Sequence, residues 1–241
     1  MSQVLRCGTF STHTVVHSKA AIKMPAEMPL DRACLIACGV ITGVGAALNT
    51  APVFAGANVA VFGCGGVGIS VVQGARLAHA RRIIAVDISP TKLRWAKEFG
   101  ATDTVDASQG DPVARVREIA DGVGVDFAYE AVGIPKTIEQ AVASLAYAGT
   151  ATHIGLPEDE QQVTLNFGNV DTGIYWNKAT LKVCHCGDAL PSNDFPLLAQ
   201  LYLQGQLKLD EMVTQRIGLG DVNEAFHAMH GGDILRSVIV L

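Results

Sequence analysis

The sequence lacks a long apolar run, a strong excess of one charge and a disulfide pattern. No stretch of 18 apolar residues is expected, and the N-terminal MSQVLRCGTF has no signal-peptide core. The formal net charge of -5 gives no reason to expect nucleic acid or an anionic membrane as a partner. We therefore expect a cytoplasmic protein without a membrane partner.

Cysteine is scarce and irregularly placed. The six cysteines lie at positions 7, 34, 38, 64, 184 and 186, and no two of them form a CxxC pair. Reduced thiols or metal ligands are favoured over a secreted disulfide framework. The 241 residues, 49% of them hydrophobic, suffice for one large domain or for one domain plus part of another.

The most informative feature is a glycine-rich turn between an apolar run and a helix of small residues. The run 59–68 reads VAVFGCGGVG, and a second apolar run at 83–87 reads IIAVD. In a dinucleotide-binding unit the first glycine permits the tight turn, the middle ones let the backbone approach a pyrophosphate, and the last lets the helix pack closely. The helix N-terminus then offers free N–H groups to phosphates. These candidate cofactor-binding glycines are Gly63, Gly65, Gly66 and Gly68.

Asp87 ends the second apolar run, 19 residues beyond Gly68. A carboxylate there accepts hydrogen bonds from both ribose hydroxyls and repels a 2′-phosphate, which favours NAD(H) over NADP(H). Binding of S-adenosylmethionine, which also uses an acid at a strand end, is the main alternative.

Strand and helix patterns alternate through the middle of the chain, which predicts an α/β fold with a doubly wound parallel sheet of the Rossmann type. Such sheets bind ligands at the carboxyl ends of their strands, so Val132 and Gly155 are further candidate cofactor-binding residues. The expected helices are 90–99, 111–121 and one beginning at 134–135. The expected later strands are 102–105, 125–130, 150–154 and 179–184.

Both ends of the chain fall outside this alternation. Residues 7–24 read as two strands, and the tail reads as a helix over 221–229 followed by a strand over 236–241. We expect these ends to belong to something other than the nucleotide unit.

Several segments together resemble the zinc-containing, medium-chain alcohol dehydrogenases, and the resemblance covers nearly the whole chain. The tail and YLQGQLKLDEMV are most similar to the bacterial branch with mycothiol-dependent formaldehyde dehydrogenase, next to the glutathione-linked class. The matching segments are GTFSTHTVV, ACLIACGVITGVGAALNTA, VAVFGCGGVGIS, RIIAVDISPTKLRWAKEFGAT, VDFAYEAVG and EAFHAMHGGDILRSVIVL.

The resemblance implies a division into parts. Residues 1–38 would be a remnant of a GroES-like, β-rich catalytic domain, 39–185 the NAD-binding domain, and 186–241 a return to the catalytic domain. It also implies a homodimer that pairs through the last strand of the sheet, at 179–184.

The resemblance assigns roles to five residues. Cys38 matches a protein ligand of the catalytic zinc, and Thr42 a threonine beside the nicotinamide. Val67 matches a valine behind the same ring, Lys92 a lysine at the adenosine ribose, and Arg236 an arginine that binds the pyrophosphate. The alternative for Cys38 is a small buried packing residue, and for Lys92 and Arg236 a solvated surface charge.

The chain departs from the family in its metal ligands. Family members carry upstream a cysteine, a Gly-His-Glu motif and often a four-cysteine lobe, whereas here no histidine precedes a glutamate and no CxxC occurs. A catalytic zinc takes three protein ligands plus water, and Cys38 is the single matched one. The triplet 184–186 (Cys-His-Cys) is expected on a strand, whose alternation keeps it from converging on one ion.

The remaining cysteines and histidines favour structural roles. Cys64 and Cys34 are expected to pack in the interior. The pairs His13–His17 and His227–His230 are expected to serve at the surface or as caps rather than as metal ligands, and the role of His153 is open.

Two functions from different classes follow. In the first, the chain is the body of a zinc- and NAD-dependent dehydrogenase that acts on a small-molecule alcohol or thiol adduct. There the zinc polarises the substrate oxygen and hydride passes to the nicotinamide. In the second, it is a non-catalytic NAD-binding remnant. A zinc-free medium-chain reductase is a weaker third reading.

Overall fold

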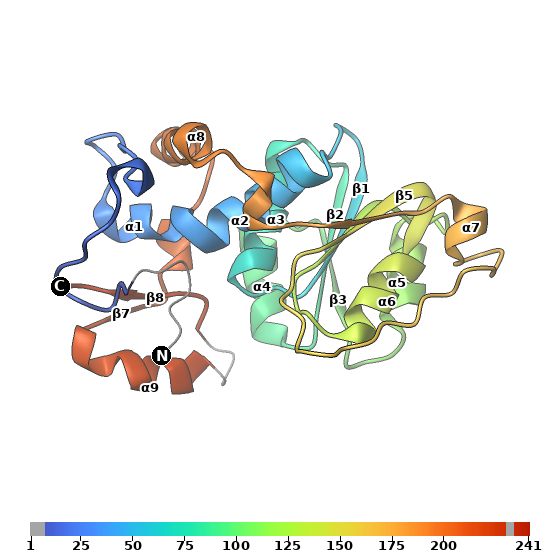
Figure 1. Cartoon of the computed structure of the whole chain (residues 1–241). Coiled ribbons are helices and arrows are strands. Elements are labelled where there is room, and N and C mark those ends of the chain that lie inside the picture. Colours follow the sequence, from blue (N-terminus) through green and yellow to red (C-terminus); the bar gives the residue numbers. More distant parts are fainter. Residues whose placement is uncertain (1–7, 230–233) are drawn as a thin grey trace. The chain divides into compact units, whose positions relative to one another are not determined.

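A computed structural model describes residues 8–229 and 234–241, and the chain divides into two compact units. The sheet unit comprises Cys38–Ala189, and the terminal unit comprises Met1–Ala37 together with Leu190–Leu241. Both are drawn in Figure 1. The assignment of the terminal segments to a catalytic domain stays a prediction.

The sheet unit contains a six-stranded parallel sheet of order β3-β2-β1-β4-β5-β6. This order is that of a doubly wound dinucleotide-binding sheet, so the predicted fold class is confirmed. The strands are β1 (Asn58–Phe62), β2 (Arg82–Asp87), β3 (Asp103–Asp106), β4 (Val125–Glu130), β5 (Leu145–His153) and β6 (Thr180–Val183).

Helices cover both faces of this sheet (Figure 1). The helices α3 and α4 pack on one face, and α5 and α6 on the other. The helices of the unit are α2 (Ile41–Gly45), α3 (Gly66–Leu77), α4 (Pro90–Phe99), α5 (Pro112–Ile119), α6 (Pro135–Ala143) and the short α7 (Ile174–Asn177).

The helix ends follow the signals in the sequence. Ser89 caps α4 by accepting a hydrogen bond from the Lys92 N–H, and the helix ends at Gly100, whose φ is 121°. Asp111 caps α5 in the same way by accepting from the Val113 N–H. The positions predicted for these helices and for β3, β4 and β6 are confirmed to within two residues, whereas β5 begins at Leu145, five residues before the predicted start.

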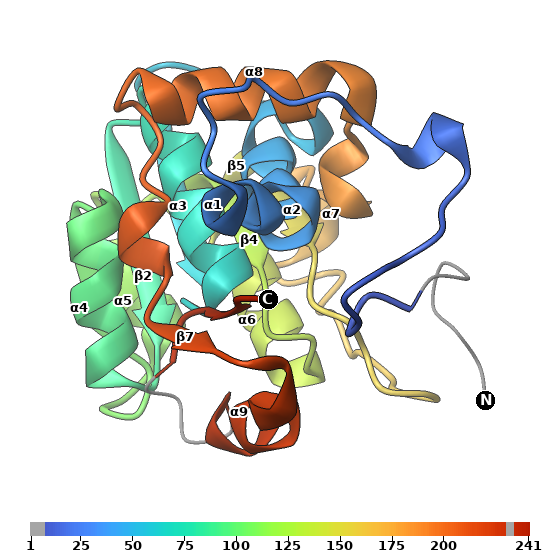
Figure 2. The ribbon, with the colours of Figure 1, turned by 90° about the vertical axis from the view of Figure 1, so that its left-hand side faces the viewer.

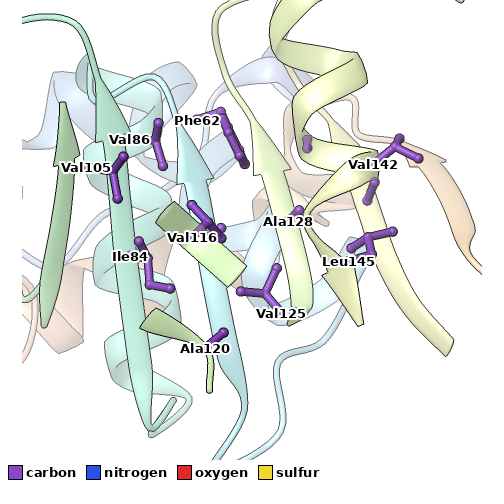
Figure 3. Packing of buried hydrophobic residues seen from close by; sticks show 13 residues of the cluster. Phe62, Ile84, Val86, Val105, Val116, Ala120, Val125, Ala128, Val142 and Leu145 are labelled. Carbon is purple, nitrogen blue, oxygen red and sulfur yellow. The ribbon is translucent and has the colours of Figure 1, made fainter. Parts of the chain in front are cut away.

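The core of the sheet unit explains why the strands read as apolar. All five residues of β1 are buried, as expected for a central parallel strand covered on both faces. Figure 3 shows Phe62, Val86 and Val142 in a cluster of buried side chains to which strands and the helices α5 and α6 contribute. Burying each large aliphatic side chain contributes about 1.5–3 kcal/mol.

Residues 30–50 correct one expectation. The helical stretch Leu30–Thr50 is long and apolar enough to span a membrane by length and composition. Nevertheless, 61% of its most apolar window is buried within the protein, as in the core helix of a globular domain. The sequence-based statement that no such stretch exists was wrong, because small residues such as alanine and glycine make this segment apolar without forming a conspicuous run of large side chains.

The terminal unit is less regular, and its elements are best followed in Figure 2. Its strands β7 (Gln215–Ile217) and β8 (Ser237–Ile239) form a two-stranded parallel sheet. Its helices are α1 (Leu30–Leu35), α8 (Pro191–Leu203) and α9 (Val222–Met229). The predicted helix and strand of the tail are therefore confirmed as α9 and β8.

The two strands predicted within 7–24 are wrong for the part that the structure describes. Residues 8–24 contain one short helical turn, Ser18–Ala20, and no strand. Val15 is 98% exposed, so its alternation with polar neighbours does not mark a buried face. A strand needs a hydrogen-bonded neighbour, and none of the described strands pairs with this segment.

Candidate functional site

A cavity of about 360 Å³ opens at the carboxyl ends of β1, β2 and β4. This is the point where the strand order reverses, since β2 and β3 lie on one side of β1 and β4 to β6 on the other. The volume suits a small organic ligand. The lining residues are Phe62, Gly63, Gly65, Val86, Asp87, Ile88, Lys92, Ala107, Ala131, Val132, Ile134, Thr137 and Gln140.

The glycine turn has the geometry that phosphate binding requires. Gly63 has φ 91°, a left-handed conformation that favours glycine. A Cβ on Gly68 would overlap the Gly63 carbonyl oxygen, so only glycine lets α3 begin this close to β1. At Gly65 a Cβ would meet nothing within 4 Å, which leaves the turn open to a ligand. The first N–H groups of α3 thus stand beside the cavity.

Asp87 lines the same cavity and is held by two backbone groups. Its Oδ2 accepts a hydrogen bond from the Cys64 N–H at 2.8 Å, and its Oδ1 accepts from the Ser89 N–H at 2.9 Å. Each carboxylate oxygen has a second acceptor site, so both remain able to accept from a ligand hydroxyl. Lys92, one turn into α4, supplies a positive charge to the same cavity.

Glu130 does not line the cavity but holds the loop that does, and the sequence reasoning missed it. It ends β4, and its side chain is only 2% exposed. Its Oε1 accepts hydrogen bonds from the Val132 N–H at 2.8 Å and the Gly133 N–H at 2.7 Å, and its Oε2 lies 2.6 Å from His153 Nδ1. An acid ends the strand VDFAYE just as Asp87 ends RIIAVD, but that acid alone does not reveal its partners.

The structure brings together some of the predicted site residues and not others. Gly63, Gly65, Asp87, Lys92 and Val132 line one cavity. The other predicted residues do not line it. Gly66, Val67 and Gly68 form the first turn of α3, Gly155 packs against Gly133, Cys38 and Thr42 lie on the helical stretch before β1, and Arg236 belongs to the terminal unit.

The described residues do not fit a zinc ion. Among them, no group of three or more His, Cys, Asp or Glu side chains is arranged to hold a metal. Cys38 is exposed, so the alternative of a buried packing residue is wrong in this chain. Its predicted role as a zinc ligand stays a prediction.

The premise that residues 184–186 lie on a strand is also wrong. The strand β6 ends at Val183, and Cys186 begins a helical turn with φ 50°. Cys184 is buried, and burial raises the pKa of its thiol, whereas Cys186 is exposed. Residues 184–186 thus follow the last strand of the sheet and lead into a helical turn.

For the remaining cysteines and histidines, some of the predicted roles agree with the structure and others do not. Cys64 is buried as predicted, and burial strongly raises the pKa of its thiol, with the Asp87 charge adding to the effect. Cys34 is exposed, so its predicted packing role is wrong, because α1 buries Leu35 and not Cys34. His17 accepts from the Lys19 N–H and caps a turn, as predicted. His227 is exposed, in line with its predicted surface or cap role, and His230 lies outside the described residues.

Comparisons with known proteins place these observations in a family. A family model described as zinc-binding dehydrogenase matches residues 66–204. The chain is 37% identical to an S-(hydroxymethyl)glutathione dehydrogenase of Saccharomyces cerevisiae over 97% of its own length and 60% of that protein. It is 37% identical to an alcohol dehydrogenase class-3 of Zea mays over 97% of its length and 60% of the relative.

A solved structure agrees with these sequence matches. The crystal structure of an alcohol dehydrogenase zinc-binding domain protein from Burkholderia ambifaria superposes with a TM-score of 0.89 at 35% identity. The match covers 95% of this chain and 60% of that one. The chain thus spans about 60% of the length of the relatives it matches.

Proposed function

The chain belongs to the zinc-binding dehydrogenase family, and from that premise we propose that it carries the NAD-binding part of a dehydrogenase. The observation that carries this proposal is the place of Asp87. Its carboxylate stands at the end of β2, in one cavity with the glycine turn and Lys92. A ribose with two free hydroxyls suits such a carboxylate, whereas a 2′-phosphate is repelled by it.

Different residues around the cavity are proposed to bind different parts of the cofactor. The N–H groups at the start of α3 and the positive end of its dipole receive the pyrophosphate. Asp87 and Lys92 receive the adenosine ribose, and Val132 offers an apolar surface near the end of β4. When bound, NAD supplies the acceptor for a hydride.

For the whole protein we propose NAD-dependent oxidation of a small alcohol or of a thiol adduct of formaldehyde. Support comes from the printed names of the relatives, among them S-(hydroxymethyl)glutathione dehydrogenase and alcohol dehydrogenase class-3. Zinc belongs to this proposal through the family. Because the described residues do not form a zinc site, no catalytic step is assigned to zinc in this chain.

The second candidate is a chain that binds NAD without catalysing its reduction. The exposed Cys38, which belongs to no group of three or more possible metal ligands among the described residues, favours this alternative. Zinc analysis of the purified chain, with NADH formation followed on alcohols and formaldehyde–thiol adducts, separates the two. Stoichiometric zinc together with clear turnover supports a dehydrogenase. NAD binding without zinc and without turnover supports a chain that binds NAD but does not catalyse its reduction.

Two further features of the protein are proposed. All four residues of the edge strand β6 are exposed, and an edge strand of this kind offers its backbone to a second copy, which supports a homodimer. A cytoplasmic location is proposed from the family. Sedimentation of the purified chain tests the dimer.

The experiment that tests NAD binding is a titration of NAD⁺ and NADP⁺ into wild type and Asp87→Gly. Because a hydrogen bond to a charged group contributes about 1.5–3 kcal/mol, the variant should bind NAD⁺ at least about tenfold more weakly. Its preference for NAD⁺ over NADP⁺ should shrink as well. Tighter binding of NADP⁺ than of NAD⁺ by the wild type would overturn the proposal.

A further inference from the structure

The cavity beside Asp87 is mostly apolar. Among the described residues that line it, four carry a polar side chain, namely Asp87, Lys92, Thr137 and Gln140, and the others are apolar residues or glycine. The volume of about 360 Å³ is that of a small-ligand site. A ligand that fills it must therefore present a largely apolar surface with few polar groups, as a purine nucleoside does.

Three exposed apolar side chains form part of the cavity wall. Ile88 follows β2, and Val132 and Ile134 follow β4. Because β1 stands between β2 and β4 and neighbouring strands lie about 4.8 Å apart, the cavity is roughly 10 Å across, which a single nucleoside spans. A flat base placed against these side chains would remove apolar surface from water. This part of the cavity therefore suits the base of the nucleoside whose ribose lies at Asp87.

Of the two polar side chains that α6 brings to the cavity, one is already used within the protein. The Thr137 hydroxyl donates to Glu130 Oε1 at 2.7 Å or to the Ile134 carbonyl at 3.0 Å, so its single proton is committed. The side chain of Gln140 is half-buried and makes no hydrogen bond to the residues that the structure describes. Its amide therefore keeps both its donors and its acceptor for a ligand.

The helix α6 fixes the backbone of Gln140 beside the cavity. Ile134, Thr137 and Gln140 are spaced three residues apart, so they share one face of the helix, and all three line the cavity. The Gln140 carbonyl accepts from the Ser144 N–H at 3.0 Å and from the Ser144 hydroxyl at 2.8 Å. The backbone is thus held by the helix, and only the side chain adjusts to a ligand.

We propose that Gln140 hydrogen-bonds the exocyclic amino group of adenine in the bound dinucleotide and is a specificity-determining residue for the base. The inference rests on the proposed NAD binding and adds the choice of base to it. The amide oxygen of Gln140 accepts from the amino group. An amide also turns to donate to an oxygen in the same place, whereas a carboxylate only accepts and an ammonium group only donates. The side chain at position 140 thus determines which purine is preferred.

The test compares NAD⁺ with nicotinamide hypoxanthine dinucleotide, in which an oxygen replaces the exocyclic amino group, by calorimetric titration. Both ligands carry the same charge at neutral pH, so the ratio of their Kd values isolates the contact at that group. Wild type should bind the two within about threefold of each other, because the amide serves either base. Gln140→Glu should shift the ratio roughly tenfold toward NAD⁺, and Gln140→Lys should shift it by a similar factor toward the hypoxanthine dinucleotide.

Two further variants serve as controls. Lys136→Glu changes the charge on the same helix, at an exposed residue that does not line the cavity, and should leave the ratio of the two Kd values within about twofold of wild type. Gln140→Leu removes both the donors and the acceptor, and should weaken the binding of both dinucleotides by about threefold without favouring either. Thermal unfolding of each variant shows that the compared proteins are folded.

The outcomes separate this inference from the function on which it rests. A wild-type chain that binds neither dinucleotide would overturn both. Binding of NAD⁺ with the same ratio in wild type, Gln140→Glu and Gln140→Lys would overturn the role of Gln140 alone. A ratio that moves in the same direction in both charged variants would also overturn it, because a hydrogen bond to the base requires opposite shifts.

Discussion

The sheet unit and the terminal unit are held together differently. In the sheet unit β1 is wholly buried between two neighbouring strands, and consecutive elements pack on one another. In the terminal unit the strands have three residues each, and the apolar Val15 and Phe10 are 98% and 59% exposed. The first unit is organised by a continuous apolar core, and the second combines a smaller set of buried apolar residues, such as Leu209 and Met212, with polar contacts.

The polar contacts of the terminal unit join distant parts of the chain. Asp31 accepts hydrogen bonds from Arg32 and from Arg216, the latter at 3.2 Å, and Arg32 Nε donates to Asp210 at 2.6 Å. The Tyr202 hydroxyl also donates to Asp210. Exposed ion pairs contribute little stability each, so we expect the terminal unit to open before the sheet unit does.

The largest effect is expected from breaking the close packing of the sheet unit. In Gly68→Ala the new Cβ overlaps the Gly63 carbonyl oxygen, and this neighbour is a backbone group that cannot rotate away as a side chain could. We expect the free energy of unfolding to fall by about 3 kcal/mol, at the upper end for overpacking, and NAD⁺ binding to be lost. Urea unfolding and NAD⁺ titration measure the two effects.

Gly65→Ala is the matched control, because its Cβ meets nothing within 4 Å and its φ is -73°. Its unfolding free energy should stay within about 0.5 kcal/mol of wild type. Its NAD⁺ affinity should still fall, since the methyl group enters the cavity. Equal destabilisation by both substitutions would show that close approach at Gly68 does not organise the turn.

A smaller effect is expected from the ion pairs of the terminal unit. Burial acts to raise the pKa of Asp31, but the hydrogen bond from Arg216 and the charge of Arg32 outweigh it, so the pKa lies below its ordinary value. A carboxyl group with a lowered pKa stabilises the fold above its unfolded pKa, and this contribution is lost as the pH falls through the folded pKa. The terminal unit should therefore loosen below about pH 4 and not between pH 5 and 7.

Asp31→Asn should produce the same loosening at pH 7. Hydrogen exchange of β7 and β8, corrected for intrinsic rates, should become faster in the variant, while exchange in β1 and β4 stays the same. Asp106→Asn is the control, since the Asp106 pKa is also lowered, by hydrogen bonds from Ser108, but within the sheet unit. Faster exchange in β1 as well would show that the two units do not open separately.

The comparison also explains what could be predicted from the sequence. In the sheet unit the patterns are local, because each strand is followed by its own helix, with caps such as Ser89 and stops such as Gly100. Residues 8–24 gave a false prediction of strands because alternation alone does not supply a neighbouring strand. The exposure of Cys34 was missed because it depends on which helix face the rest of the fold leaves open.

In the site, too, features encoded in one short segment could be predicted, and features that depend on distant segments could not. The glycine turn and Asp87 are encoded in one short segment, and the structure brings them to one cavity. Glu130 was missed because its partners come from separate segments, namely the loop after β4, the first turn of α6 and the end of β5. A single acid at a strand end does not reveal such a convergence before the strands are in register.

The central claim is that the sheet unit holds a formed NAD site at the ends of β1, β2 and β4. Hydrogen–deuterium exchange of the purified chain, followed by mass spectrometry with and without saturating NAD⁺, tests it most directly. We expect NAD⁺ to slow exchange in the glycine turn 63–68, around Asp87 and in the loop 131–134. NAD⁺ that leaves exchange in these three segments unchanged would contradict the claim.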